Sequence, residues 1–239
     1  MPHPRSLRVP TLLAALLAAV LLVSGCGGGG DKEKKAEKSP QQVMEQAKKK
    51  FDDASSVHIN LSTTSTPSEG NGVLAATGDL TQAPAFEGDV KVVLNGLTAT
   101  VPITSVDGKV YAKLPLQTKY TVIDPAEYGA PDPSAFADPD TGMSSLLTQL
   151  DDLQKQGESR SGDQILTTYT GTLPGKAVKE IIPSAAADQT YKTSVGVDEK
   201  GYARTVKITG TFFAGNDDVT YNLKLSDYDA GVKISAPSA

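Results

Sequence analysis

The feature that most restricts the fold of this chain is a series of short segments in which apolar and polar residues alternate. Such alternation is typical of strands that bury one face. In the first half of the chain these segments cover residues 56–63, 73–78, 87–94, 97–106, 109–114 and 120–123. Asn95-Gly96 and Asp107-Gly108 each separate two neighbouring segments, which is a strong signal for a β-hairpin. The pattern therefore predicts an antiparallel meander.

The second half of the chain shows further strand patterns, at residues 164–172, 191–197, 203–213, 218–226 and 232–235. Other segments repeat with helical periodicity, at residues 39–55, 141–156 and 174–182. The Pro- and Asp-rich stretch 124–140 indicates a loop with one helical turn. Strands joined by short turns, with helices at the start and in the middle, predict an α+β fold. We expect a single large, strongly curved antiparallel sheet with helices on one face.

The N-terminal residues have the pattern of a bacterial export signal. Arg5 and Arg8 precede an apolar run over residues 9–23, which is shorter than the roughly 20 residues that a membrane-spanning helix needs. The run ends in Ser24-Gly25-Cys26, which matches the bacterial lipobox with its cysteine acceptor for a lipid thioether. Cys26 is the only cysteine of the chain, and acylation explains an unpaired exported thiol better than an ordinary signal peptide does.

This interpretation divides the chain into three parts. Residues 1–25 would be the signal peptide, residues 26–39 a lipidated flexible tether, and residues 40–239 the folded domain. The glycines and charged residues that follow Cys26 bury too little apolar surface to fold, which favours a tether. The expected location is the outer face of the bacterial plasma membrane. The membrane itself is then a partner, through the lipids on Cys26.

Composition restricts the partners further. Two of the 23 basic residues lie in the leader, so the mature chain would carry 21 basic residues against 28 acidic ones. This balance argues against nucleic acid as a partner. The chain has no Trp, five Phe and eight Tyr. Because aromatic rings usually fill much of a core, a large sheet that is poor in them either packs tightly against helices or leaves space for a ligand.

The residues that usually carry catalysis are scarce. His58 is the only histidine beyond the leader, and it alternates with Val57 and Ile59 as a solvent-facing strand residue would. With Cys26 acylated, the chain has no thiol nucleophile and no plausible zinc ligands. The run Asp138-Pro139-Asp140 resembles the start of a calcium loop but lacks the later ligands, so helix capping is the better interpretation. We therefore expect no enzymatic activity, no cofactor and no metal site.

Several runs resemble, in order and spacing, elements of the LppX/LprA/LprF/LprG lipoproteins of actinobacteria. They are Val106-Asp107-Gly108-Lys109-Val110-Tyr111-Ala112 in a hairpin, Asp138-Pro139-Asp140-Thr141-Gly142-Met143-Ser144-Ser145-Leu146-Leu147 at a loop-to-helix junction, and Tyr169-Thr170-Gly171-Thr172-Leu173 before the helix that ends at Pro183. The resemblance covers most of the mature chain and is greatest to LprG-like members. None of these motifs is catalytic.

The resemblance implies a curved antiparallel sheet that forms half of a barrel, with helices packed on its concave face. It also implies an apolar cavity, between sheet and helices, that holds lipid acyl chains. LprG-like members bind triacylated glycolipids or triacylglycerides and move them across the cell envelope beside a transporter. By this resemblance the chain would be a monomeric, non-catalytic lipid carrier. Its partners would be a lipid or glycolipid ligand and an envelope transporter.

Apolar side chains on the expected elements are the candidates for the cavity wall. They are Val90, Val92, Leu94, Leu97, Val101 and Ile103 on strands, Met143, Leu146, Leu147, Leu150 and Leu153 on the central helix, and Val178, Ile181 and Ile182 on the short helix. The loop 184–188 would lie at the mouth. Alternation indicates which residues point inward, but each of them fits a packed core equally well. The alternative is therefore a structural or interaction lipoprotein with a filled core that docks an envelope transporter.

Overall fold

The computed structural model describes residues 37–67, 70–94, 96–213, 215 and 217–238. From Lys38 onward the chain forms one compact unit. Within the described ranges, none of the helices has the length and apolar character needed to cross a membrane.

All the strands of this unit belong to one antiparallel sheet. In chain order they are β1 Ser56–Thr63, β2 Gly72–Thr81, β3 Ala85–Leu94, β4 Leu97–Val106, β5 Lys109–Ala112, β6 Thr121–Ile123, β7 Asp151–Ser161, β8 Gln164–Pro174, β9 Thr190–Asp198, β10 Ala203–Gly210 and β11 Val219–Ser226. Their order across the sheet is β6-β5-β4-β3-β2-β1-β11-β10-β9-β8-β7. The predicted single large antiparallel sheet is therefore confirmed.

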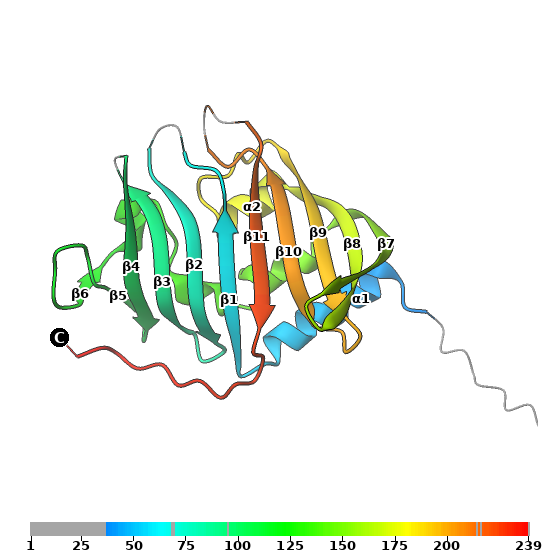
Figure 1. The fold of residues 1–239 in the computed structure, drawn as a ribbon, viewed down its shortest axis with the longest axis horizontal. Helices are drawn as coiled ribbons and strands as arrows, with labels where there is room; N and C mark the ends of the chain where they lie inside the picture. Colours follow the sequence, from blue (N-terminus) through cyan, green and yellow to red (C-terminus); the bar gives the residue numbers. More distant parts are fainter. Residues whose placement is uncertain (1–36, 68–69, 95, 214, 216, 239) are drawn as a thin grey trace, which may run out of the picture. The chain divides into compact units, whose positions relative to one another are not determined.

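The sheet consists of two meanders that meet at its centre. Strands β1 to β6 form one wing and strands β7 to β11 form the other. The wings are joined by the antiparallel pairing of β1 with β11, in which Ile59 lies opposite Leu225 (Figure 1). The predicted turn between β4 and β5 is present, because Asp107 and Gly108 both have positive φ, at 53° and 67°. Two consecutive positive φ values are what a tight type I′ hairpin requires.

The helices lie on one face of the sheet (Figure 1). Helix α1 (Pro40–Asp52) begins at a capping box formed by Ser39 and Gln42, and it packs on β7 and β10. The connection from β6 to β7 runs from one edge of the sheet to the other and contains three short 3-10 helices: η1 Pro125–Tyr128, η2 Pro133–Ala137 and η3 Met143–Thr148. Of these, η2 packs on β2, β3 and β4. Helix α2 (Gly175–Ile181) packs on β8 and β9.

The predicted helix over residues 141–156 is wrong. The chain instead forms η3 and then enters β7, which pairs with β8 at the edge of the sheet. The sequence of β7 contains good helix formers, but pairing with β8 supplies backbone hydrogen bonds that the local pattern does not reveal. Nearly every residue of β7 is exposed, and Lys155, Glu158 and Arg160 give this edge strand the charged character that discourages edge-to-edge pairing.

The predicted strand at residues 232–235 is also wrong, since this segment has no regular secondary structure. The physical reason is the topology. Strand β11 already has β1 and β10 as neighbours, and the open edges of the sheet are β6 and β7. A strand directly after β11 would have no free edge within reach.

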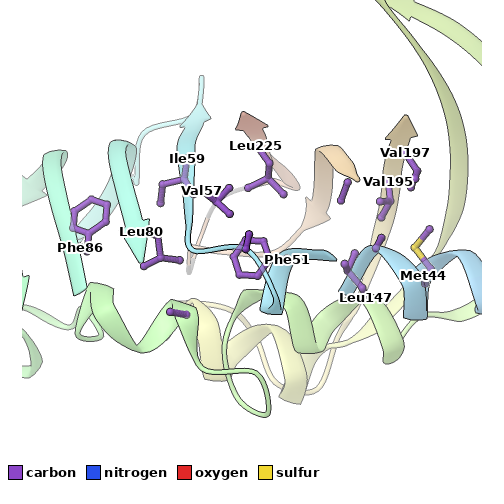
Figure 2. Packing of buried hydrophobic residues seen from close by; sticks show 14 of the residues in the cluster. Met44, Phe51, Val57, Ile59, Leu80, Phe86, Leu147, Val195, Val197 and Leu225 are labelled. Atoms are coloured by element: carbon purple, nitrogen blue, oxygen red, sulfur yellow. The ribbon is translucent and has the colours of Figure 1, made fainter. Parts of the chain in front are cut away.

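The packed core lies mainly beneath the second wing and the centre of the sheet. Met44 and Phe51 of α1 and Leu147 of η3 face Val195 of β9 and Leu225 of β11 (Figure 2). A second cluster lies around α2, where Val178 and Leu146 pack with the rings of Tyr191, Phe212 and Tyr221. The Phe212 ring lies 4.9 Å from that of Tyr191 and 4.7 Å from that of Tyr221. Four aromatic residues, Tyr191, Phe212, Phe213 and Tyr221, are thus buried together at this end.

Candidate functional site

A cavity of about 410 Å³ lies beneath the first wing of the sheet. One wall is the inner face of β1 to β6, and the opposite wall is the segment Pro125 to Phe136, here called the roof, together with the end of α2. The lining comprises Ile59, Leu61, Asn71, Gly72, Val73, Ala76, Phe86, Val90, Val92, Leu94, Val101, Ile103, Val110, Leu114, Ile123, Pro125, Glu127, Tyr128, Gly129, Ala130, Pro131, Pro133, Phe136, Ile181, Ile182, Pro183, Ser184 and Tyr221. Most of these side chains are apolar.

The strand wall follows from alternation along the first wing. Val90, Val92 and Leu94 of β3 point to the same face, and Val101 and Ile103 of β4 extend it, with Val90 directly opposite Val101. Residues two apart on a strand share a face, so the polar residues between them point to the other side of the sheet. The arrangement gives a continuous hydrocarbon surface.

The roof is held by side-chain caps and by a contact with the sheet. Asp124 caps η1 by accepting a hydrogen bond from the Ala126 amide at 2.9 Å. Asp132 caps η2 in the same way, accepting from the amide and the hydroxyl of Ser134, both at 2.9 Å. The hydroxyl of Ser105, which is fully buried on β4, also donates to Asp132. This carboxylate therefore joins the roof to the wall.

The segment that follows the roof is tied to α1. Asp138 accepts hydrogen bonds from the amides of Asp140 and Thr141, at 2.9 and 2.8 Å. These bonds, the one from Thr141 first, hold the pKa of the Asp138 carboxyl below its usual value. Asp138 thus caps a turn. The predicted capping of a helix over residues 141–156 is wrong, because η3 begins after Gly142, which makes no side-chain cap hydrogen bond. Beyond this turn, the Ser144 hydroxyl donates to Asp52 of α1 at 2.6 Å.

Polar groups are concentrated at the rim of the cavity. Asn71, Glu127 and Ser184 are exposed members of the lining, and they come from the β1–β2 loop, from η1 and from the loop after α2. Deeper in, the Tyr221 hydroxyl donates to the carbonyl of Val73, where β2 has an irregular register with β3. Burial raises the pKa of Tyr221 well above its usual value, so its hydroxyl stays protonated. The site thus combines an apolar interior with a polar rim.

The structure places some of the sequence candidates at the cavity and others elsewhere. Val90, Val92, Leu94, Val101, Ile103, Ile181 and Ile182 belong to the lining. Met143, Leu146, Leu147, Leu150, Leu153 and Val178 pack in or against the two core clusters instead. Leu97 is 76 % exposed at the start of β4. Ser184, from the loop expected at the mouth, lies in the lining.

The sequence analysis did not predict that the roof lines the cavity. Pro125, Pro131, Pro133 and Phe136 all line the cavity, but they belong to a Pro-rich stretch without any period. Val110, Leu114 and Ile123 were also missed, although the alternation on their strand segments places them on the inner face. That same alternation could have identified them.

His58 lies away from the cavity. Its side chain points to the opposite face of β1 from Ile59, where its Nδ1 lies 2.8 Å from an oxygen of Asp79 and its Nε2 lies 3.3 Å from the Thr77 hydroxyl. Among the described residues there is no group of His, Cys, Asp and Glu side chains arranged to hold a metal ion. Cys26 and the leader lie outside the described residues.

Comparison with known families decides the affiliation. The model of the LppX_LprAFG lipoprotein family matches residues 39–234, which is nearly the whole described unit. The chain belongs to the LppX/LprAFG lipoprotein family. Among curated members, the lipoarabinomannan carrier protein LprG of Mycolicibacterium hassiacum is 27 % identical over 199 residues, covering 82 % of this chain and 83 % of that protein. The protein of the same name from Mycolicibacterium smegmatis is 29 % identical over 205 residues, covering 82 % of each chain.

Solved structures of the family share the fold. LprF from Mycobacterium bovis matches with a TM-score of 0.66 at 17 % identity, covering 84 % of this chain and 97 % of that one. The lipoprotein LppX from Mycobacterium tuberculosis matches with a TM-score of 0.62 at 20 % identity, covering 82 % and 98 %. The resemblance noted in the sequence is therefore confirmed, as is the fold class.

Proposed function

We propose that this chain is a membrane-anchored, non-catalytic carrier that binds lipid acyl chains in the cavity and transfers them across the cell envelope. The observation that carries the proposal is the mostly apolar space of about 410 Å³ beneath the roof. Packed interiors rarely hold voids larger than a water molecule, whereas ligand pockets measure roughly 300–1,000 Å³. The size of the space favours a carrier over a structural lipoprotein with a filled core.

The chemistry of the lining supports acyl chains as the bound group. Long hydrocarbon chains are too insoluble to cross an aqueous space alone, and a carrier offers them a dry compartment. The relatives named lipoarabinomannan carrier protein LprG support the same class of cargo. Acyl chains of triacylated glycolipids or triacylglycerides are the cargo that we propose. Their polar heads would lie at the rim, beside Asn71, Glu127 and Ser184.

The volume limits how much cargo fits at one time. A methylene group is about as large as a water molecule, whose share of the liquid is about 30 Å³. A cavity of about 410 Å³ therefore holds roughly one acyl chain. A cargo with several chains would displace the roof outward or leave some chains outside the protein.

The anchor completes the proposal. Lipids on Cys26 would keep the carrier at the outer face of the plasma membrane after removal of residues 1–25, with residues 26–39 as the tether. Fully extended, the stretch from Cys26 to Lys38 spans roughly 40 Å. The domain could thus turn and move near the membrane without leaving it, and an envelope transporter would meet it there.

Native mass spectrometry tests the carrier directly. A form that lacks residues 1–26 would be offered a triacylglyceride, a diacylated glycolipid and, as a matched control, the same glycolipid after removal of its acyl chains. We expect one-to-one adducts with the two acylated lipids and none with the deacylated control. A folded protein that keeps its ligand-free mass with every lipid would refute the proposal, and equal binding of the deacylated control would show that the head, not the chains, is recognised.

A further inference from the structure

The β5–β6 hairpin exposes apolar side chains in a way that its own fold does not require. Among the described residues, the large apolar side chains that are most exposed are Leu97, Leu116, Val122 and Ile165. Leu116 is fully exposed at the tip of the β5–β6 loop, and Val122 on β6 is 60 % exposed. Exposed apolar groups that gather in one place mark contact surfaces.

The backbone at Leu116 makes this exposure more informative. Leu114 to Gln117 form a tight turn, in which the Gln117 amide donates to the Leu114 carbonyl at 3.0 Å. Pro115 is its second residue, and Leu116 is its third, with φ of 69°. Such a turn normally has Gly or Asn at that position, because a Cβ is strained there. A strained leucine that contacts no core points to a role outside the fold.

The charges on the hairpin have one sign. Residues 108–123 contain Lys109, Lys113 and Lys119 and neither Asp nor Glu, in a chain whose formal net charge is −5. The nearest acidic residues in sequence, Asp107 and Asp124, lie at the end of the hairpin opposite Leu116, since β5 and β6 are antiparallel. Apolar side chains flanked by lysines match the surface of a bilayer that contains anionic lipids.

The hairpin is also part of the cavity wall. On its inner side, Val110, Leu114 and Ile123 line the cavity. A shallow hollow at the same edge of the sheet shares Val110, Ile123, Pro125, Ala130 and Pro131 with the cavity lining. A single layer of side chains therefore separates this edge from the cavity.

We propose that the β5–β6 hairpin docks on an anionic bilayer, with Leu116 and Val122 inserted among the lipids and Lys113 and Lys119 at the phosphates. This contact is distinct from the covalent anchor on Cys26. It orients the edge of the sheet formed by β6 (Figure 1) toward the membrane, so that the cavity is presented to the lipids rather than to solvent.

Vesicle sedimentation tests the docking without the anchor. The protein would be the form that lacks residues 1–26, because the unit from Lys38 onward is compact and has its own core. We expect it to bind vesicles of phosphatidylcholine with 30 mol % phosphatidylglycerol, and to bind pure phosphatidylcholine at least tenfold more weakly. Loss of binding to the anionic vesicles at high salt is also expected.

The variant Leu116→Gly separates docking from folding. Glycine is favoured at φ of 69°, so the fold should keep its stability while vesicle binding falls about tenfold, as expected for losing one inserted leucine. Replacing Lys113 and Lys119 by glutamine should weaken binding about fivefold per lysine. Ile165→Thr, on β8 in the other wing, is the matched control and should bind as the wild type does.

Fluorescence gives a second readout, since the chain has no tryptophan. In the variant Leu116→Trp, the emission of the only tryptophan should shift to the blue when anionic vesicles are added. In the control variant Ile165→Trp, the emission should not shift. Wild-type protein that fails to bind anionic vesicles, or Leu116→Gly that binds as well as wild type, would refute the docking. Binding to both vesicle types alike would refute the proposed contact with anionic lipid, and failure to bind either type would direct the search to a protein partner. Cargo binding is measured separately, so either proposal can fail alone.

Discussion

Replacing Val101 by tryptophan would distinguish empty space from a packed wall. Val101 is on the inner face of β4, is 4 % exposed, and lines the cavity. Tryptophan exceeds valine by about 80 Å³, and filling a cavity contributes roughly 24 cal/mol per Å³, so the ring should stabilise the ligand-free fold by up to about 2 kcal/mol. The ring would also take about a fifth of the 410 Å³ that an acyl chain needs.

Val195→Trp is the matched control for this change. Val195 also lies on the inner face of a strand, β9, and is 1 % exposed, but it belongs to the packed cluster beneath α1 and not to the cavity lining. Adding the same ring there forces neighbouring side chains apart, which costs about 1–3 kcal/mol. The difference in sign between the two variants would report the space available at each position.

Urea unfolding with and without an acylated lipid measures both effects. A ligand present at a hundredfold excess over its Kd stabilises the fold by about 2.7 kcal/mol. We expect this gain in the wild type and not in Val101→Trp, whose ligand-free stability is already equal or higher. The reasoning would be wrong if Val101→Trp lost as much stability as Val195→Trp, or if lipid still stabilised it fully.

Two further predictions concern the polar groups around the cavity. Asp132→Ala should destabilise the fold by about 1–3 kcal/mol, because it leaves the buried Ser105 hydroxyl without its acceptor. Hydrogen exchange of the backbone amides across the roof should accelerate. Asp132→Asn keeps an acceptor, so both effects should be smaller in that variant. Tyr221→Phe should cost about 1 kcal/mol at pH 7 through the lost bond to Val73. Since the pKa of Tyr221 is raised in the folded state, its stabilising contribution is complete below about pH 10 and declines as the pH rises. Urea unfolding of Tyr221→Phe should therefore show a shallower alkaline decline, and an unchanged slope would count against this account.

Most of the sheet could be predicted because its signals are local. Each strand of the first wing carries its own alternation, and Asp107-Gly108 specifies a two-residue turn by itself. Helix α1 was predicted for the same reason, since Ser39 and Pro40 mark its start and Ala47 and Phe51 repeat along its buried side. These features need no information about distant residues.

The errors have a local source and a non-local one. The apolar spacing of Met143, Leu147 and Leu150 suits a long helix, and this pattern outweighed a competing local signal, the two-residue turn at Gly162 that joins β7 to β8 in a hairpin. Residues that line the cavity could not be distinguished from core residues by sequence, because Val101 and Val195 have the same alternating pattern. What differs is the element that covers each residue: the roof, which Asp132 joins to the sheet, in one case, and α1 in the other.

The pairing of β1 with β11 has a consequence for the kinetics of folding. Each wing can form through hairpins between neighbouring segments, but the contact that unites them sets Ile59 against Leu225, almost the full length of the domain apart. Closing so long a loop costs entropy before the pairing offsets it, and proteins dominated by such non-local contacts fold in roughly milliseconds to seconds. The central seam of the sheet should therefore form last, and a chain interrupted before β11 would leave β1 as an open edge.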